Sequence, residues 1–477
     1  MILRRFIKRW EARGGYRDVL IIAIPLILST GALSIQHFID RMYLTWYSPE
    51  AIAASVPAGI LNFTIVSLFI GTASYVSTFV AQYYGAKQDD KIGRVVWQGV
   101  FFSLLSIPVM LLFIPLSVPI FRLVGHETSV MDLEIRYFVI MCIGGVFPII
   151  AAAIGGFFSG LGATRIVMWV NLSAMAVNII LDYIMIFGRF GFPEMGIDGA
   201  AWATVAAGAF SMLFFFTILF SRKYRLKYSI FKGIQFDKEL LFRLVRFGFP
   251  NGVQFFLDML GFTLFILLVG KYGKIELAAT NIAFNINGLA FMPMIGFGIA
   301  VSVLVGQNLG NRNPEQAEYV TWSAAQMSLL YMTSISICYL IFPEIFLKPF
   351  GMGGNSEAFN QITEYTIVLL RFIAFYSIFD SFTIIFASAI KGAGDTRFVM
   401  KVMVALSWGV LIIPTYFAVE VFHWHLYVAW IFATAYVSIL GFVFLYRFLQ
   451  GKWKNMLVIE LNNDQTAREL PGELVSG

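Results

Sequence analysis

Twelve stretches of this chain are apolar enough and long enough to cross a membrane. A helix that spans the hydrocarbon core of a bilayer, roughly 30 Å thick, needs about 20 residues. Of the 477 residues, 59% are hydrophobic and only 13% are charged, whereas soluble domains carry about 25% charged residues. We therefore predict an all-α polytopic membrane protein. The expected spans cover residues 18–43, 56–82, 95–121, 135–158, 166–188, 199–221, 244–270, 279–307, 319–345, 364–390, 398–419 and 425–448.

The second half of the chain repeats the first half. At an offset of 225 residues, the matching pairs are Pro25 and Pro250, Gly71 and Gly296, Ser77 and Ser302, Gln82 and Gln307, and Gly85 and Gly310. After a seven-residue insertion, GLGATR at 160–165 matches GAGDTR at 392–397. Six spans separate equivalent positions, so both halves have the same orientation. We predict two homologous six-helix lobes, related by a pseudo-two-fold axis along the membrane normal, as in several transporter folds.

Basic residues gather in every second loop and at both termini, which hold 26 of the 34 Lys and Arg residues. The positive-inside rule then predicts that both termini are cytoplasmic in a plasma (inner) membrane. Apolar residues at helical spacing in the N-terminal segment suit a helix on the membrane surface, with a mobile basic tail as the alternative. The expected parts are a basic amphipathic segment (1–17), an N-lobe (18–221), a cytoplasmic linker (222–243), a C-lobe (244–449) and a polar, loosely ordered tail (450–477).

Several classes of function lack their sequence signals. The two cysteines, Cys142 and Cys338, lie in apolar spans, and no metal-binding pattern joins the four histidines. No phosphate-binding P-loop occurs, which leaves ATP-driven export unsupported. GAGD at 392–395 fits the GxGD pattern of intramembrane aspartyl proteases, but Asp395 matches Ala163 in the other half, which favours a repeated turn. We expect neither an enzyme nor a cofactor, and no nucleic-acid partner.

Four acids in or near the spans have no acidic counterpart in the other half. Asp40 matches Phe265, Asp182 matches Pro414, Asp258 matches Leu33 and Asp380 matches Pro148. An acid in the membrane costs several kcal/mol and is therefore a candidate functional residue. Asn178 and Asp182 share a helix face, where they could hold a proton or a small cation. The alternative is structural: an acid that reaches the interface or caps a helix, especially Asp40 beside Arg41.

Longer motifs resemble those of the multidrug and toxic compound extrusion (MATE) family. The motifs are GIAVSVLVGQNLGNRNPEQA at 298–317 and its echo GTASYVSTFVAQYYGAKQDD at 71–90. The resemblance covers about residues 15–450. It implies an N-lobe site for cation or proton coupling that consists of Asp40, Asn178, Asp182 and Thr204, the last in GAAWAT.

The NorM-type branch of that family has a second acidic site in the C-lobe. Its span-seven acid lies eight residues after a proline, which here is Pro250 and leads to Asp258. Its span-ten acid and the Tyr one turn earlier match Asp380 and Tyr376. The span-seven acid is usually Glu in that branch, so the shorter Asp258 departs from the pattern. The resemblance implies a cation or substrate site at these three residues, with Na⁺ as the one metal ion expected.

The resemblance also implies a function. Members of the family are secondary antiporters that expel amphipathic, often cationic organic compounds in exchange for inward H⁺ or Na⁺, by alternating access of the two lobes. The partners expected here are such compounds and the lipid bilayer, and the chain is expected to act as a monomer. A flippase for lipid-linked saccharides of the same superfamily is the nearest alternative, although its pyrophosphate favours basic rather than acidic intramembrane residues. A channel is less consistent with acids confined to unmatched positions.

Overall fold

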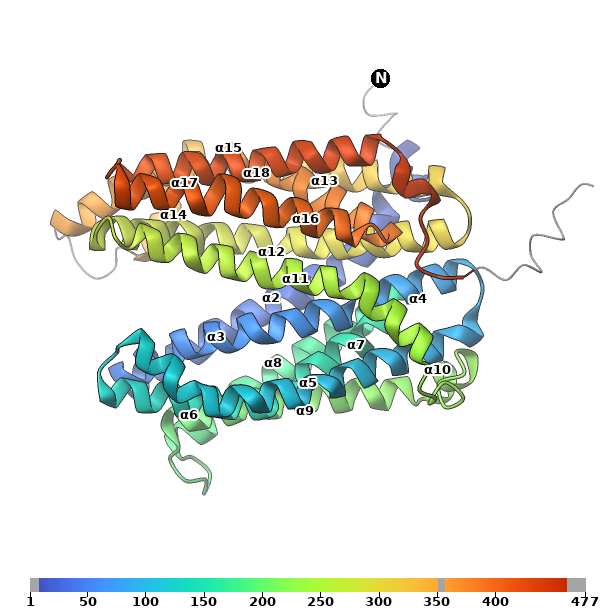
Figure 1. Ribbon diagram of the computed structural model, residues 1–477, viewed down its shortest axis with the longest axis horizontal. Helices are drawn as coiled ribbons and strands as arrows, with labels where there is room; N and C mark the ends of the chain where they lie inside the picture. Colours follow the sequence, from blue (N-terminus) through green and yellow to red (C-terminus); the bar gives the residue numbers. More distant parts are fainter. Residues whose placement is uncertain (1–7, 351–356, 461–477) are drawn as a thin grey trace, which may run out of the picture.

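The structure, a computed structural model, describes residues 8–350 and 357–460. In this part of the chain, eleven helices are long and apolar enough to span a membrane. A twelfth span consists of two helices, α6 (Thr128–Gly144) and α7 (Val146–Gly160), which meet at a 40° bend. Figure 1 shows two groups of roughly parallel helices, one from each half of the chain. The prediction of twelve helices in two six-helix lobes is confirmed.

The N-lobe has one span that is interrupted and one that is bent. Its first span is one helix, its second breaks at Tyr75, and its fourth bends at Gly145. The remaining helices of this lobe are α2 (Tyr16–Tyr47), α3 (Pro49–Ser74), α4 (Val76–Gly85), α5 (Asp89–Val124), α8 (Thr164–Phe187) and α9 (Gly196–Leu219). The short helix α10 (Arg222–Lys227) follows in the connection to the C-lobe.

The C-lobe repeats this order with different irregularities. Its helices are α11 (Lys238–Val269), α12 (Lys274–Gly310), α13 (Pro314–Ile341), α14 (Pro343–Leu347), α15 (Glu357–Ala393), α16 (Thr396–Leu406), α17 (Ile413–Tyr416) and α18 (Leu426–Leu449). The eleventh span contains α16 and α17 together with two π-helical segments, Ser407–Ile412 and Phe417–Val421. Such π-segments are frequent at functional sites.

Most helices begin before the apolar stretch that identified them, because polar caps lie outside the apolar core. The Oγ of Ser48 accepts from the amide of Ala51 at 3.0 Å, so α3 begins at residue 49 rather than 56. The carboxylate of Asp237 accepts from the amide of Leu240 at 3.0 Å. Helix α11 therefore begins at Lys238, inside the stretch 222–243 that the sequence assigned to a linker.

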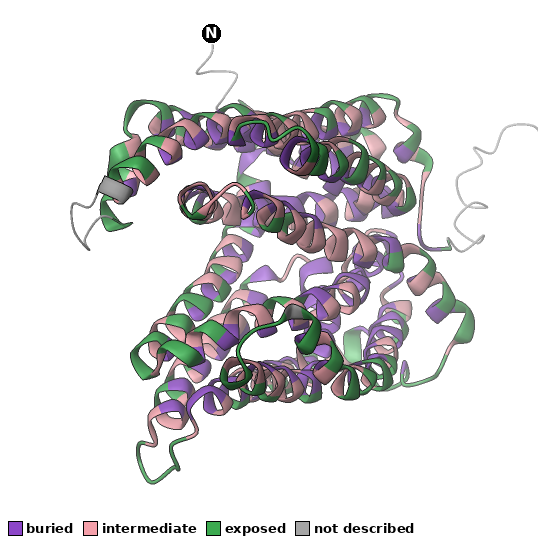
Figure 2. Cartoon of the chain, turned by 60° about the vertical axis from the view of Figure 1, so that its left-hand side comes forward, coloured by how far each residue is buried: buried purple, intermediate pink, exposed green. Residues whose placement is uncertain are grey.

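The two lobes meet at one end of the molecule, which we call the basic end. It carries the loops near residues 86–88, 161–163, 220–237, 311–313 and 394–395, and also residues 450–460. Among the described residues, the interlobe hydrogen bonds run from this end to about the middle of the spans, where Thr30 Oγ1 donates to the carbonyl of Met292 at 3.3 Å. Figure 2 shows the ribbons of the two lobes close together at the basic end and diverging toward the other end.

Glycines allow the lobes to approach closely at the basic end. A Cβ atom on Gly85 would lie 2.0 Å from the carbonyl oxygen of Gln307. The repeat-equivalent Cβ on Gly310 would lie 2.0 Å from the carbonyl oxygen of Gln82. Helix α4 of the N-lobe and helix α12 of the C-lobe thus make the same backbone contact twice, which a side chain at either glycine would block.

The structure describes only parts of the two terminal segments. The predicted surface helix falls largely on residues 1–7, which lie outside the described residues, whereas residues 8–11 are helical. Residues 461–477 also lie outside them. The prediction of a loosely ordered tail was wrong for residues 450–460, because Trp453, Val458 and Ile459 are buried in the main apolar core. Two short apolar groups in a polar segment give no periodic signal from which this packing could be predicted.

Candidate functional site

The N-lobe acids lie together between helices α2 and α8. The carboxyl groups of Asp40 and Asp182 lie close to each other, because a single side-chain nitrogen, that of Asn178, lies within hydrogen-bond distance of both. In the amide orientation that satisfies its hydrogen bonds, Asn178 donates to Asp40 Oδ1 at 2.8 Å and to Asp182 Oδ2 at 3.2 Å. Asn178 and Asp182 are completely buried. One Asp182 oxygen, Oδ1, has no hydrogen-bond partner among the described residues.

These contacts show which groups the Asp40 side chain faces. Arg41 is adjacent in sequence and contributes electrostatically, but the described ion pairs include none between Arg41 and Asp40. The carboxyl group points instead to the acid and amide of α8. Asp40 therefore belongs to an intramembrane polar cluster rather than to a surface ion pair.

The cluster has a further member that sequence reasoning missed. The side chain of Gln36, 9% exposed, lies 3.2 Å from the Asn178 amide nitrogen. Gln36 precedes Asp40 by one helical turn, just as Asn178 precedes Asp182, so two polar pairs face each other across α2 and α8. This i, i+4 spacing is the signal that could have identified it. Thr204 lies on α9, which packs against α8, and no hydrogen bond from it to the acids is among the described contacts.

The C-lobe acids come from helices α11 and α15. Asp258 and Asp380 are close enough to interact electrostatically, and Asp258 interacts in the same way with Lys391. Gln254 precedes Asp258 by about one turn of α11. The hydroxyl of Tyr376, one turn before Asp380, accepts a long hydrogen bond of 3.4 Å from Asn287 Nδ2. The structure thus brings Asp258 and Asp380 into one region, although more loosely than the N-lobe acids.

The two acidic groups lie at different depths. Asp258 is equivalent to position 33 of the first span, seven residues before Asp40. At ~1.5 Å per residue, this places Asp258 about 10 Å nearer to the basic end. The C-lobe group also leaves polar atoms without partners among the described residues, including Gln254 Oε1 and Asn287 Oδ1. The lobes are therefore alike in fold and unlike in polar chemistry.

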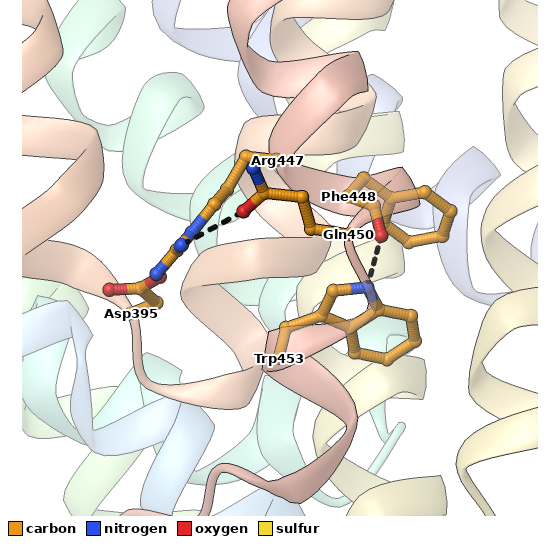
Figure 3. A network of polar contacts seen from close by, with 5 residues as sticks. All are labelled: Asp395, Arg447, Phe448, Gln450 and Trp453. Atoms are coloured by element: carbon orange, nitrogen blue, oxygen red, sulfur yellow. Dashed lines mark hydrogen bonds and ion pairs between the residues drawn. The ribbon is translucent and has the colours of Figure 1, made fainter.

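The acid of the GxGD stretch has a structural partner. Arg447 donates to Asp395 Oδ2 from Nη2 at 2.6 Å and from Nε at 3.0 Å. Figure 3 shows this pair beside Gln450, which accepts from Arg447 Nη1 at 3.2 Å. Gly162 and Gly394 have φ of +77° and +114° at equivalent places in the two halves. The motif is a turn present in both lobes, in which Asp395 fixes the end of α18.

Replacing Asp395 by Asn is expected to affect stability more than transport. The pair is largely buried, with side-chain exposures of 16% for Arg447 and 12% for Asp395. Loss of a charge-assisted hydrogen bond costs about 2 kcal/mol, so the melting temperature of the purified protein should fall. Efflux per folded molecule should stay within about twofold of the unchanged protein, an effect of less than ~0.5 kcal/mol on the rate. Complete loss of efflux by a stably folded variant would contradict this assignment.

The sequence matches a known family over both lobes. The MatE family model covers residues 25–184 and 250–417. The chain belongs to the MatE family. The two matched segments correspond to the two repeats, and all four unmatched acids lie within them. The resemblance that the sequence motifs indicated is thus confirmed, and relatives named NorM support the branch.

Relatives in the family are named as multidrug resistance proteins. A "Probable multidrug resistance protein NorM" of Thermotoga maritima is 26% identical over 467 residues, which is 96% of this chain and 97% of the relative. Multidrug resistance protein PmpM of Pseudomonas aeruginosa is 28% identical over 407 residues, 83% of each chain.

Solved structures share the fold. One, described as the outward-facing conformation of a multidrug resistance MATE family transporter of the MOP superfamily, has a TM-score of 0.84 at 18% identity and covers 95% of this chain and 99% of its own. A MOP superfamily transporter from Pyrococcus furiosus has the same TM-score of 0.84 at 20% identity, with the same coverage of both chains. These matches establish the fold of the chain over nearly its whole length.

Proposed function

We propose that this protein is a secondary antiporter that exports amphipathic organic cations in exchange for inward protons. One observation carries the proposal: inside the N-lobe, the Asn178 amide nitrogen lies 2.8 Å from an oxygen of Asp40 and 3.2 Å from an oxygen of Asp182, so the two carboxyl groups are close neighbours. Two carboxylates held this close in apolar surroundings repel each other, which favours a proton on one of them. The departure of that proton would leave two like charges close together. The pair is thus a site whose charge changes as a proton arrives or leaves.

A drug cation could replace that proton. Deprotonation of the pair creates negative charge in apolar surroundings, where a cation is attracted more strongly than in water. Asn178 and Gln36 supply amide groups that can orient either occupant. Competition between proton and drug for the same carboxyl groups couples their opposite movements, and names of relatives such as PmpM support a drug as the exported compound.

The direction of transport follows if the basic end is cytoplasmic. The basic loops favour that orientation, and the lobes meet at this end. The described conformation would then open toward the outside of a plasma membrane, where protons enter and drug leaves. A rearrangement that separates the lobes at the basic end would expose the site to the cytoplasm.

Efflux of ethidium from drug-loaded cells tests the proposal. A proton gradient and a sodium gradient are imposed separately, and efflux is compared with cells that carry an empty vector. Efflux driven by the proton gradient alone supports the proposal. Efflux driven only by sodium would retain drug export but assign the coupling to Na⁺, and would contradict the proton mechanism. No efflux under either gradient would overturn drug export and favour the flippase.

A further inference from the structure

We propose that residues 450–460 form a C-terminal strap that holds the lobes together at the basic end, and that this strap must leave Gln82 before the lobes can separate there. The inference rests on the proposed alternation of the two lobes. It concerns the control of that alternation rather than the ion or drug site. The strap lies at the basic end, where α2 begins at Tyr16, whereas Asp40 lies 24 residues farther along α2.

Two equivalent glutamines first join the lobes symmetrically. Gln82 Nε2 of α4 donates to the carbonyl of Gly392 at 3.0 Å, and Gln307 Nε2 of α12 donates to the carbonyl of Gly160 at 2.8 Å. Gln82 and Gln307 are repeat equivalents, as are Gly160 and Gly392. The pseudo-two-fold axis therefore produces the same crossing hydrogen bond twice.

The strap breaks this symmetry on one side. The amide of Val458 donates to Gln82 Oε1 at 2.8 Å, so Gln82 bonds to α15 through its nitrogen and to the strap through its oxygen. The described contacts contain no corresponding bond to Gln307 Oε1. Gln82 is completely buried. If the strap stayed in place without Gln82, the Val458 amide would lose its partner in a buried position, which is unfavourable.

The strap is anchored on the C-lobe, so its bond to Gln82 connects the two lobes. Arg243 of α11 donates to the carbonyl of Val458 at 3.0 Å and to Glu460 Oε1 at 2.5 Å. Trp453 stacks on Phe448 with ring centroids 4.9 Å apart, and its indole nitrogen donates to the Phe448 carbonyl at 2.9 Å (Figure 3). The strap thus follows the last C-lobe helix, remains fixed to that lobe, and reaches across to the N-lobe.

The apolar residues of the strap are buried, and Val458 packs beside Gly394. Val458 is fully buried and Ile459 is 5% exposed. A Cβ atom on Gly394 would lie 2.8 Å from the Val458 side chain. The absence of a side chain at Gly394 therefore makes room for Val458 beside the turn that carries Asp395.

The N-terminal segment makes the reciprocal crossing. It leads into the N-lobe, yet Arg9 donates to Ser323 Oγ of α13 at 3.1 Å and Tyr16 donates to Gln326 Oε1 at 2.6 Å. The C-terminal strap contacts the same helix, because Lys454 pairs with Glu318 at 2.5 Å. Each terminal segment thus belongs to one lobe and binds the other, an arrangement that favours the closed basic end.

Distances between spin labels at the basic end test the strap directly. Labels on Asp90→Cys of the N-lobe and Glu315→Cys of the C-lobe are placed in a background with Cys142→Ser and Cys338→Ser. Double electron–electron resonance in lipid nanodiscs, without drug, gives the ratio of the long-distance to the short-distance population. A chain ended after Gly451 lacks residues 452–460 of the strap, and a chain ended after Glu460 is the matched control. Full-length Val458→Pro removes the amide donor while it keeps the whole strap, since proline has no N–H.

Removal of the strap and Val458→Pro are each expected to raise this ratio about three- to tenfold, as expected for loss of a buried hydrogen bond. The chain that ends after Glu460 should match the full chain. In the Gln82→Leu background, removal of the strap should raise the ratio by less than about twofold further. In the Gln307→Leu background it should raise the ratio by its full three- to tenfold, because of the two glutamines only Gln82 bonds to the strap. An unchanged ratio in both strap variants, or equal added effects in the two glutamine variants, would overturn the proposal. Because no drug is present, loss of the proposed export function would leave this result unaffected.

Discussion

Replacing Asp182 by Asn is expected to reduce proton-driven ethidium efflux at least about tenfold, equivalent to ~1.4 kcal/mol. The Asn side chain keeps the size of the carboxyl group but cannot gain or lose a proton near neutral pH. With Asn at position 182, the side chain beside Asp40 and Asn178 has a single charge state. Asp40→Asn should have the same effect, and the double variant should be little worse than either single one, since both remove the same shared proton.

Efflux rates from proteoliposomes that contain equal amounts of folded protein measure this effect. Thr204→Val is a useful comparison, because Thr204 makes no described hydrogen bond to the acids and is expected to lose less activity. Asp380→Asn examines whether the C-lobe acids are also required. Full proton-driven efflux in Asp40→Asn and Asp182→Asn would show that the N-lobe pair is structural.

Gly310→Ala is expected to push the lobes apart at the basic end. The new Cβ would overlap the carbonyl oxygen of Gln82, 2.0 Å away, and backbone on both sides limits relaxation. Overpacking of this kind costs about 1–3 kcal/mol, so the closed population should fall by about five- to 150-fold relative to the open one. Gly85→Ala should act equally, because its Cβ would meet the Gln307 carbonyl oxygen at the same distance.

Gly288→Ala is the matched control for this effect. Gly288 lies on the same helix α12, and a Cβ there would meet nothing within 4 Å. The label pair at residues 90 and 315 measures all three variants, and efflux should fall in Gly85→Ala and Gly310→Ala alone. If Gly310→Ala has the same distance distribution as Gly288→Ala, the close contact between α4 and α12 does not control opening.

The fold was largely predictable because it depends on signals that the chain carries locally. Apolar length identifies the spans, and matched glycines and prolines at a fixed offset identify the duplication. The caps at Ser48 and Asp237 lie outside the apolar stretches, so helix ends were less predictable. The π-helical turns of the eleventh span depend on packing against neighbouring helices and have no comparable sequence signal.

The candidate site was predictable in part. The spacing of Asn178 and Asp182 and the unmatched Asp40 pointed to residues that the structure brings together. Gln36 was missed because a glutamine costs less free energy in a span than an acid does, so the criterion that selected the acids does not select it. The strap was missed because Val458 and Gln82 are 376 residues apart, and no short pattern predicts a contact between them. The coupling roles assigned to these residues remain predictions.

Proton release on drug binding tests the central claim most directly. Ethidium is added to the purified protein in weak buffer, and bound dye and released protons are measured together. Competition for the Asp40–Asp182 pair predicts about one proton released per bound cation, because the pair must give up its proton when the cation binds. The Asp182→Asn variant should release almost none. Ethidium binding to the unchanged protein without proton release, or equal release from Asp182→Asn, would contradict the account.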